Sequence, residues 1–435
     1  MTVISVREFA VLTTQDGSFS IDRATISDAD FAWLADSSRR SAENASFINV
    51  TGRGTLTVQN YVGVLRLPSG NEIEVLPKHT HDLDSVHGSR QLLFRMIAQS
   101  LGISPRVAEA ANLKVLNRPF TEWMAETFLR EALVLLSRGF RRDYLLTETK
   151  ERSLRGRLHI ARQMRAGPAD ATHFHVEHDI YSFDRPENRA IKSAVRMISR
   201  QTAVASTWQT AAELLNLLGD IPESRDFTSD LRNWRSDRLM AHYEPLREMC
   251  SLILTGRTPF AVSGPNLAQS MLFPMEKLFE GFVVRAVQKA LPAAFQVHRQ
   301  PRRHKLCHFG SAQWFDLRPD LLVTRDEEAW ILDAKWKILH GVEKEHYGLS
   351  QSDFYQLNAY GQTYLGGTGD LFLIYPRTPG IPAFGKPFRM QPDLRLYVLA
   401  IDLEDGSVDL SPIKESAGRV VDNRRSNSSA VGLHT

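Results

Sequence analysis

Residues 317–338 read LRPDLLVTRDEEAWILDAKWKI, two apolar runs on either side of a charged turn. The runs Leu317–Arg325 and Glu328–Ile338 are rich in aliphatic and aromatic residues, as strands are. Asp326 and Glu327 between them are typical turn residues. The pattern therefore predicts a β-hairpin with a short turn.

An even-numbered turn centred between these two residues places Asp320 directly opposite Asp333. Side chains in such a pair have Cβ atoms roughly 4.5–5.5 Å apart, and like charges there are destabilising. The two-residue repeat of a strand puts Lys335 on the same face as Asp333, whereas Leu332 and Ala334 point to the other face. The sequence thus predicts two facing carboxylates with a lysine beside them.

Two carboxylates and a lysine are a hydrolytic arrangement when a divalent cation joins them. Mg²⁺ takes oxygen ligands from one or two carboxylates and leaves the rest of its coordination sphere to water and phosphate. Lys335 would then orient or deprotonate the attacking water, while the cation neutralises charge on a phosphodiester. The alternative is a surface hairpin with solvated charges. We favour it less, because Asp333 and Lys335 interrupt a run that is too apolar to be exposed.

The chain has 435 residues, of which 43% are hydrophobic and 24% charged, as expected for a globular protein of two or three domains. Its formal net charge of +3 permits nucleic acid binding without requiring it. Cys250 and Cys307 are too few for a disulfide framework or a cysteine-rich zinc site. The first residues do not resemble a signal peptide and no long apolar run occurs, so we expect a soluble cytoplasmic protein.

The patterning predicts a mixed α+β fold with four segments. Residues 1–110 form an N-terminal β-rich module, residues 111–265 a mainly helical middle region, residues 266–410 a C-terminal α/β domain and residues 411–435 a flexible tail.

Within these segments, we expect several helices and strands. Helices are expected near 28–39, at 90–101, at 120–138 and across 187–218, and an N-terminal hairpin turns at 68–71. Glu72 and Glu74 share one face of that hairpin's second strand, where solvated side chains are expected. In the C-terminal domain, strands are expected at 371–375 and 394–403.

Further candidate site residues lie around the catalytic hairpin. Glu280 borders the apolar stripe of a helix beginning near Met275, where it either reaches a metal site or only covers the stripe. Gln356 and Tyr360 share one face of a helix that we expect Ser352-Asp353 to cap. A basic run precedes the hairpin, where a DNA backbone would approach, although a solvated loop face explains it equally well. The run consists of Arg299, Arg302, Arg303, His304 and Lys305.

Two groups in the middle region carry open alternatives. Six arginines could contact phosphate, solvent or a partner protein. They are Arg138, Arg141, Arg142, Arg152, Arg155 and Arg157. His173, His175 and His178 are clustered, but a metal site is disfavoured because only the first two share a strand face.

The catalytic residues resemble a known motif. Pro319-Asp320 followed by Asp333-Ala334-Lys335 resembles the PD…(D/E)xK nuclease motif. With further segments, the chain resembles the McrC family, the nuclease subunit of McrBC modification-dependent restriction systems, from about Asn60 to Leu403. The segments are Tyr61-Val-Gly-Val, Val75-Leu-Pro-Lys78, Leu154-Arg-Gly-Arg157, Pro186-Glu-Asn-Arg189, Lys277-Leu-Phe-Glu280, Arg318-Pro-Asp320, Asp333-Ala-Lys335 and Asp353-Phe-Tyr-Gln-Leu-Asn-Ala-Tyr360. The last also resembles the Gln-x-x-x-Tyr signature of RecB-like nucleases.

This resemblance implies a restriction-endonuclease-like C-terminal domain and a Mg²⁺-dependent DNA endonuclease. Asp320 and Asp333 would be the Mg²⁺ ligands, the Ala334 carbonyl a candidate third ligand, and Lys335 the residue on the attacking water. Glu280, Gln356 and Tyr360 would have supporting roles in catalysis.

The resemblance also implies a partner, a McrB-like hexameric AAA+ GTPase that recognises methylcytosine-containing double-stranded DNA. The N-terminal part of the chain would enter the partner ring and stimulate GTP hydrolysis, with no membrane involved. Two alternatives remain: a non-catalytic adaptor that activates an AAA+ ring, and a RecB-like exonuclease or repair nuclease. Circular and linear DNA substrates would distinguish the latter.

Overall fold

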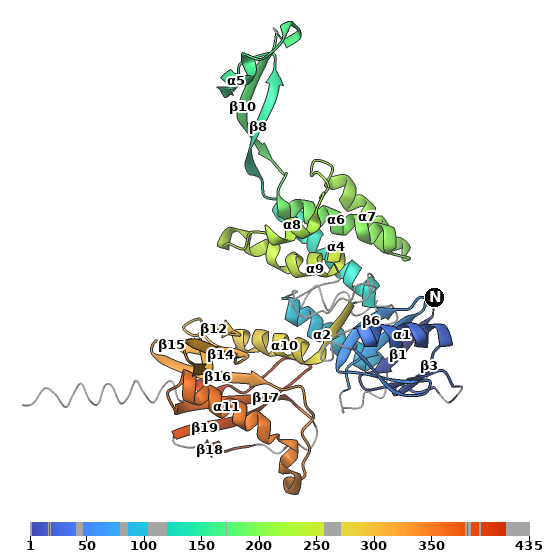
Figure 1. The fold of residues 1–435 in the computed structure, drawn as a ribbon, viewed down its shortest axis with the longest axis vertical. Helices are drawn as coiled ribbons and strands as arrows, with labels where there is room; N and C mark the ends of the chain where they lie inside the picture. Colours follow the sequence, from blue (N-terminus) through green and yellow to red (C-terminus); the bar gives the residue numbers. More distant parts are fainter. Residues whose placement is uncertain are drawn as a thin grey trace, which may run out of the picture. The chain divides into compact units, whose positions relative to one another are not determined.

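The computed structural model describes most of the chain, in two compact units (Figure 1). One unit combines Met1–Asn117 with Phe260–Thr435, and the other is Arg118–Pro259. The described residues are 2–15, 17, 19–40, 47–78, 86–102, 120–170, 172–255, 271–378, 381, 384–390 and 393–414. Most of the expected tail, residues 415–435, lies outside them.

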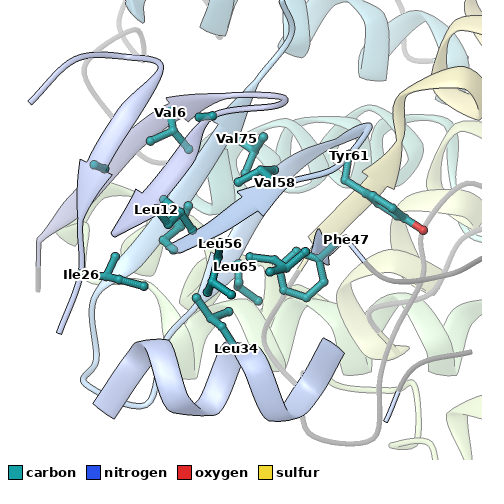
Figure 2. Close-up of a cluster of buried hydrophobic side chains, with 14 of the residues drawn as sticks. Val6, Leu12, Ile26, Leu34, Phe47, Leu56, Val58, Tyr61, Leu65 and Val75 are labelled. Carbon is teal, nitrogen blue, oxygen red and sulfur yellow. The ribbon is translucent and has the colours of Figure 1, made fainter. Parts of the chain in front are cut away.

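The N-terminal part of the first unit contains two four-stranded sheets and a helix. Their orders are β1-β7-β6-β11 and β3-β2-β5-β4. The elements are β1 (Val3–Arg7), β2 (Val11–Thr13), β3 (Arg23–Thr25), α1 (Asp28–Arg40), β4 (Ile48–Gly52), β5 (Thr55–Val58), β6 (Tyr61–Arg66), β7 (Glu72–Leu76) and β11 (Met271–Pro274). Figure 2 shows their common core, in which Leu34 of α1 points toward the strands that carry Leu12, Leu56 and Leu65. The predicted helix and the hairpin that turns at 68–71 are confirmed.

The expected solvated face of β7 is wrong. Glu72 is 4% exposed and Glu74 is fully buried. β7 lies between β1 and β6, and α2 (Val86–Leu101) packs against it. Arg90 of α2 donates to Glu74 from Nε at 2.7 Å and from Nη2 at 2.5 Å, and Ser5 Oγ donates to the same carboxylate at 2.7 Å. The burial of Glu74 is therefore offset by a charged partner from α2 and a hydroxyl from β1.

The N-terminal module and the C-terminal segment are joined by strand pairing and helix packing. β11 pairs with β6 in an antiparallel ladder, in which Gly63 lies opposite Leu272 and has a φ of +122°. A Cβ at this position would lie 2.0 Å from the Met271 carbonyl oxygen, so the close approach requires glycine. Helix α10 (Met275–Ala290) follows β11 and packs on α2, where Ser100 Oγ donates to the Leu278 carbonyl at 3.1 Å.

The C-terminal segment forms a mixed six-stranded sheet, ordered β12-β15-β16-β17-β19-β18. Strands β16, β17 and β19 are parallel, and the other pairings are antiparallel. Helix α11 packs on β16 and β17, and α10 packs on β16 and β12. The elements are β12 (Gln296–Arg299), β13 (His304–Phe309), β14 (Ala312–Leu317), β15 (Leu321–Arg325), β16 (Glu328–Ala334), η3 (Glu343–Gly348), α11 (Gln351–Tyr364), β17 (Thr368–Pro376), β18 (Phe388–Met390) and β19 (Asp393–Ile401).

Several predicted boundaries in this segment need correction. Leu317 ends β14, which pairs with β13 in a separate two-stranded sheet, so the hairpin strand begins only at Leu321. Pro319 lies between them and has no N–H to donate to a ladder. Ser350, not Ser352-Asp353, is the N-cap residue of α11, and Asp353 lies in the first turn.

The second unit contains helices and a three-stranded sheet ordered β8-β10-β9. Its elements are α4 (Phe120–Arg138), β8 (Asp143–Glu151), β9 (Arg157–Leu158), α5 (Ile160–Gln163), η1 (Pro168–Asp170), β10 (Phe174–Ser182), α6 (Pro186–Gln201), α7 (Ala205–Leu217), α8 (Phe227–Arg232), η2 (Arg238–Tyr243) and α9 (Glu244–Thr255). The helix predicted across 187–218 is in fact two helices, α6 and α7. The backbone at Thr202, between them, is extended, and the Thr202 hydroxyl donates to the Glu122 carboxylate. In this unit, β8 and β10 extend away from α6–α9 (Figure 1). In the parts of the chain described, no helix has the length and apolarity needed to cross a membrane.

Candidate active site

The predicted hairpin register is confirmed. β15 and β16 pair with Leu321 opposite Leu332, so Asp320 lies just before β15, opposite Asp333 in β16. Asp326 occupies the turn with a φ of +54°. Asp320 is 8% exposed and Asp333 is 2% exposed. The hairpin therefore places two buried carboxylates opposite each other.

The Asp320 carboxylate accepts from the backbone, and the Asp333 carboxylate pairs with Lys335. The Ala334 N–H donates to Asp320 Oδ2 at 2.8 Å, and Lys335 Nζ lies 2.7 Å from Asp333 Oδ2. The Gln300 N–H donates to the Asp320 carbonyl oxygen at 2.9 Å. The first of these contacts joins the two segments of the hairpin at the residues predicted to be catalytic.

Negative charge is concentrated at this point. Burial raises the pKa of Asp320 well above its ordinary value, and the charges of Asp333 and Glu280 raise it further. Burial also raises the pKa of Asp333; Lys335 opposes this, whereas Glu280 and Asp353 add to it. Burial alone would lower the pKa of Lys335, but the neighbouring aspartates outweigh it, so the pKa is raised. A bound cation would relieve the repulsion among these carboxylates.

Gln356 and Tyr360 reach the site through Lys335. Lys335 Nζ donates to Gln356 Oε1 at 2.9 Å, and Gln356 Nε2 donates to the Tyr360 hydroxyl at 2.7 Å. The Tyr360 hydroxyl donates in turn to the Arg318 carbonyl at 3.0 Å. Burial raises the pKa of Tyr360 to about 12, so the phenol keeps the proton it donates. The predicted i, i+4 pair on α11 is thus a hydrogen-bonded chain that positions the lysine.

Glu280 lies beside this constellation and is 8% exposed. It accepts from Lys277 Nζ at 2.6 and 2.9 Å and from Gln300 Nε2 at 3.0 Å. Gln300 therefore links Glu280 to Asp320, with its backbone at a φ of +41°. No local signal in the sequence marks Gln300, and the sequence predicts Asp353 as a helix cap and as part of the family segment, not as a neighbour of the catalytic carboxylates. Asp353 Oδ2 in fact accepts from the Tyr375 hydroxyl at 3.3 Å.

A contact from the N-terminal module also reaches this region. Trp336, next to Lys335, donates from Nε1 to Glu8 Oε1 at 3.1 Å and packs on Phe279 with ring centroids 5.3 Å apart. Glu8 is fully buried and also accepts from the Lys78 N–H at 2.7 Å. Burial raises the pKa of Glu8 to about 7. No sequence signal connected residues so far apart in the chain.

The donor set fits Mg²⁺. Asp320 and Asp333 supply only oxygen atoms, and Mg²⁺ sites need as few as one or two carboxylates when water and phosphate complete the sphere. Within the described ranges, no three His, Cys, Asp or Glu side chains are arranged to hold a metal ion by themselves. That includes the three clustered histidines: His175 Nε2 lies 3.7 Å from Asp170, and His178 is buried.

Comparisons with known proteins place the chain in a family. The family model for a McrBC 5-methylcytosine restriction system component matches residues 56–376, which include the opposed aspartates and the Gln356–Tyr360 pair. None of the curated proteins matches the chain.

Solved structures from Thermococcus gammatolerans are also similar. A chain from a refined half-complex of a tetradecameric assembly of McrB AAA+ hexamers with bound McrC is 19% identical, with a TM-score of 0.60 over 92% of this chain and 95% of that one. A chain from a cryo-EM structure of the McrBC complex is 20% identical, with a TM-score of 0.48 over 69% of this chain and 90% of that one. The first likeness is one of fold, and the family match confirms the resemblance drawn from the sequence. The chain belongs to the McrBC 5-methylcytosine restriction system component family.

Proposed function

We propose that the chain is the nuclease subunit of a McrBC-like restriction system. In this proposal it is a Mg²⁺-dependent endonuclease with a PD-(D/E)xK domain, and it cleaves methylcytosine-containing DNA when an AAA+ GTPase partner activates it. The family match supports the system. The observation that carries the nuclease activity is the buried pair Asp320 and Asp333, with Lys335 Nζ 2.7 Å from Asp333.

In this proposal, different residues bind the metal ion, orient the attacking water and position the lysine. Asp320, Asp333 and the Ala334 carbonyl would hold Mg²⁺, which when bound neutralises phosphodiester charge and makes water more acidic. Lys335 has a raised pKa, so it keeps its proton near neutral pH. That favours orienting water and stabilising developing negative charge over removing a proton. Gln356 and Tyr360 fix the lysine head for this task.

The proposed contact with the GTPase ring has two candidate surfaces. The resemblance implies that the N-terminal module contacts the ring. Most of the large apolar side chains of this module, however, are packed in its own core. The second unit exposes more apolar surface, on the sheet formed by β8, β9 and β10, which we name the β arm. It exposes several large apolar side chains, as a protein-binding surface would. They are Tyr144, Leu145, Leu146, Phe174, Ile180 and Tyr181.

The base of the β arm is firmly held. Asn188 of α6 donates from Nδ2 to the carbonyls of Arg141 and Phe183, both at 2.9 Å, and these residues flank the two long strands. The Tyr243 hydroxyl donates to Asn188 Oδ1 at 2.9 Å. The Pro186-Glu-Asn-Arg189 segment therefore positions the β arm, which supports a role in contacting the partner.

Recognition of modified DNA would belong to the partner. A net charge of +3 supplies little non-specific affinity for phosphate, and we find no base-reading motif in the sequence. We therefore expect the chain alone to cut DNA poorly. Cleavage should require a McrB-like partner, GTP and Mg²⁺ together.

The test is cleavage of methylated and unmethylated circular plasmids by the chain, with and without partner, GTP and Mg²⁺. Selective cutting of the methylated plasmid only in the complete mixture is the expected result. Methylation-selective cutting by the chain alone would contradict the division of labour. Degradation of linear DNA only would indicate a RecB-like nuclease, and stimulated GTP hydrolysis with no cutting would indicate an adaptor.

A further inference from the structure

The two-stranded sheet β13–β14, here called the aromatic hairpin, comes just before the catalytic residues in the sequence. Most of its side chains are exposed in both strands, around a turn at Gly310 with a φ of +61°. Four large apolar side chains are among them. They are Leu306 (53% exposed), Phe309 (76%), Trp314 (47%) and Phe315 (65%).

The base of the aromatic hairpin is anchored, although isolated two-stranded sheets are marginally stable. The His304 ring packs edge-on against Tyr364 of α11 with centroids 4.5 Å apart. The Tyr364 hydroxyl donates to the Leu317 carbonyl at 2.8 Å. Further out, Trp314 packs against both Phe309 and Phe315, with centroids 6.1 and 5.9 Å apart. The aromatic hairpin is thus anchored at its base and exposes an aromatic cluster to solvent.

The charge of this segment indicates which kind of molecule binds the aromatic hairpin. Residues 302–318 contain four Lys or Arg and one acid, Asp316, so the segment alone carries an excess of +3, equal to that of the whole chain. Lys305 and Arg318 both pair with Asp316 and, through hydrogen bonds, lower its pKa to about 2. Arg302 and Arg303 are exposed. The excess of +3 on so short a segment complements the negative phosphate backbone of DNA, and DNA-binding proteins insert apolar side chains such as Phe and Leu into a groove.

The hairpin is also continuous with the site. Its last residue, Leu317, precedes Arg318-Pro319-Asp320, and Tyr360 binds the Arg318 carbonyl. A DNA strand whose phosphodiester reached Asp320 and Asp333 would therefore pass close to the hairpin base.

We propose that the aromatic hairpin is a duplex DNA-contacting element of the nuclease. Arg302 and Arg303 bind backbone phosphates beside the scissile bond, and Phe309, Trp314 and Phe315 make apolar contacts with sugars and bases in a groove. This inference rests on the proposed nuclease function. It adds a surface that secures DNA without reading methylation.

The test measures binding rather than cleavage. The full chain carrying Asp333→Asn would be titrated with a fluorescein-labelled unmethylated duplex at low salt, followed by fluorescence anisotropy. Phe309→Ala with Trp314→Ala should weaken binding by at least about tenfold, because both large apolar contacts with the groove are removed. The matched control is Trp208→Ala on α7, which removes a 55% exposed tryptophan from the other unit and should change affinity by less than about twofold.

Two further variants sharpen the result. Arg302→Ala with Arg303→Ala should reduce the slope of log affinity against log salt by about 2, because each phosphate contact contributes roughly 0.9. Phe309→Trp with Trp314→Phe keeps the aromatic surface and should restore binding, which separates loss of contact from misfolding. Unchanged DNA affinity in the alanine variant would overturn the hairpin proposal, as would loss of partner binding with DNA affinity intact. Plasmid cleavage by the otherwise unaltered chain with its partner decides the nuclease function separately.

Discussion

Asp320 and Asp333 are charged residues buried in the six-stranded sheet, whereas Tyr144, Leu146 and Tyr181 are apolar residues exposed on the β arm. Each region inverts the usual distribution, in which charges face water and large apolar groups are inside. In the sheet, burial concentrates carboxylates where a cation can offset them. In the β arm, exposure leaves apolar area that another molecule can cover.

The comparison indicates that the two inversions serve different tasks. Buried charge with raised pKa values is typical of catalytic sites. Exposed apolar surface held at its base is typical of binding surfaces. If so, substitutions in the sheet should affect cleavage and substitutions in the β arm should affect the partner. The predictions below test that separation.

Asp333→Asn should have the largest effect, lowering the rate of plasmid cleavage by about 1,000-fold or more, because it removes a metal-ligand charge. GTPase stimulation should be unchanged. The matched control is Asp370→Asn, which alters another buried aspartate of the same sheet, paired with Arg395 at 2.6 Å. The control should keep cleavage within a few-fold of wild type. Equal loss in both variants would mean that sheet stability, not the site, is being measured.

Lys335→Met should lower cleavage by about 100-fold while Mg²⁺ affinity, measured by calorimetry, is retained. The reason is that the lysine acts on water and developing charge, and both aspartates remain. Gln356→Leu should give a smaller loss in the same direction, since it frees Lys335 without removing it. A Lys335→Met variant that cleaves at wild-type rates would move the reacting centre away from this hairpin.

Tyr144→Ser combined with Tyr181→Ser should reduce stimulation of the partner's GTPase by about tenfold or more, because large aromatic side chains dominate binding interfaces. The two rings pack on each other 5.1 Å apart and are 71% and 55% exposed, so the fold should survive. Trp208→Ser is the control on the same unit. Normal stimulation by the double variant, together with loss on substituting exposed Phe9 and Phe19, would favour the N-terminal module as the contact.

Glu8→Gln should have the smallest effect on cleavage, and it should appear only as a pH dependence of stability. The folded pKa of Glu8 is about 7, above its ordinary 4.5, so its protonated form stabilises the fold at low pH, and this stability is lost as pH rises through 7. A difference of that size corresponds to roughly 3 kcal/mol at most. Denaturant unfolding between pH 5 and 8 should show a flatter dependence for Glu8→Gln. Parallel curves for both proteins would contradict the buried ionisation.

Local features were predictable from sequence, and features that depend on distant partners were not. The hairpin register followed from its turn, and the Gln356–Tyr360 face followed from helical spacing. Glu74 could not be recognised as buried, because its partner Arg90 lies on a later helix. Gln300 and the Glu8–Trp336 bond were missed for the same reason. These contacts join segments separated in the chain and carry no periodic signal.

The pairing of β6 with β11 has a consequence for synthesis on the ribosome. Arg66 ends β6 and Met271 begins β11, so the second strand emerges roughly 200 residues later, ~10–40 s at about 5–20 residues per second. During that interval the edge of β6 is a template for pairing with other chains. The second unit lies wholly within the interval and can complete its fold first. The unit that carries Asp320 and Asp333 is therefore the last to close, and nascent chains should need protection at this edge.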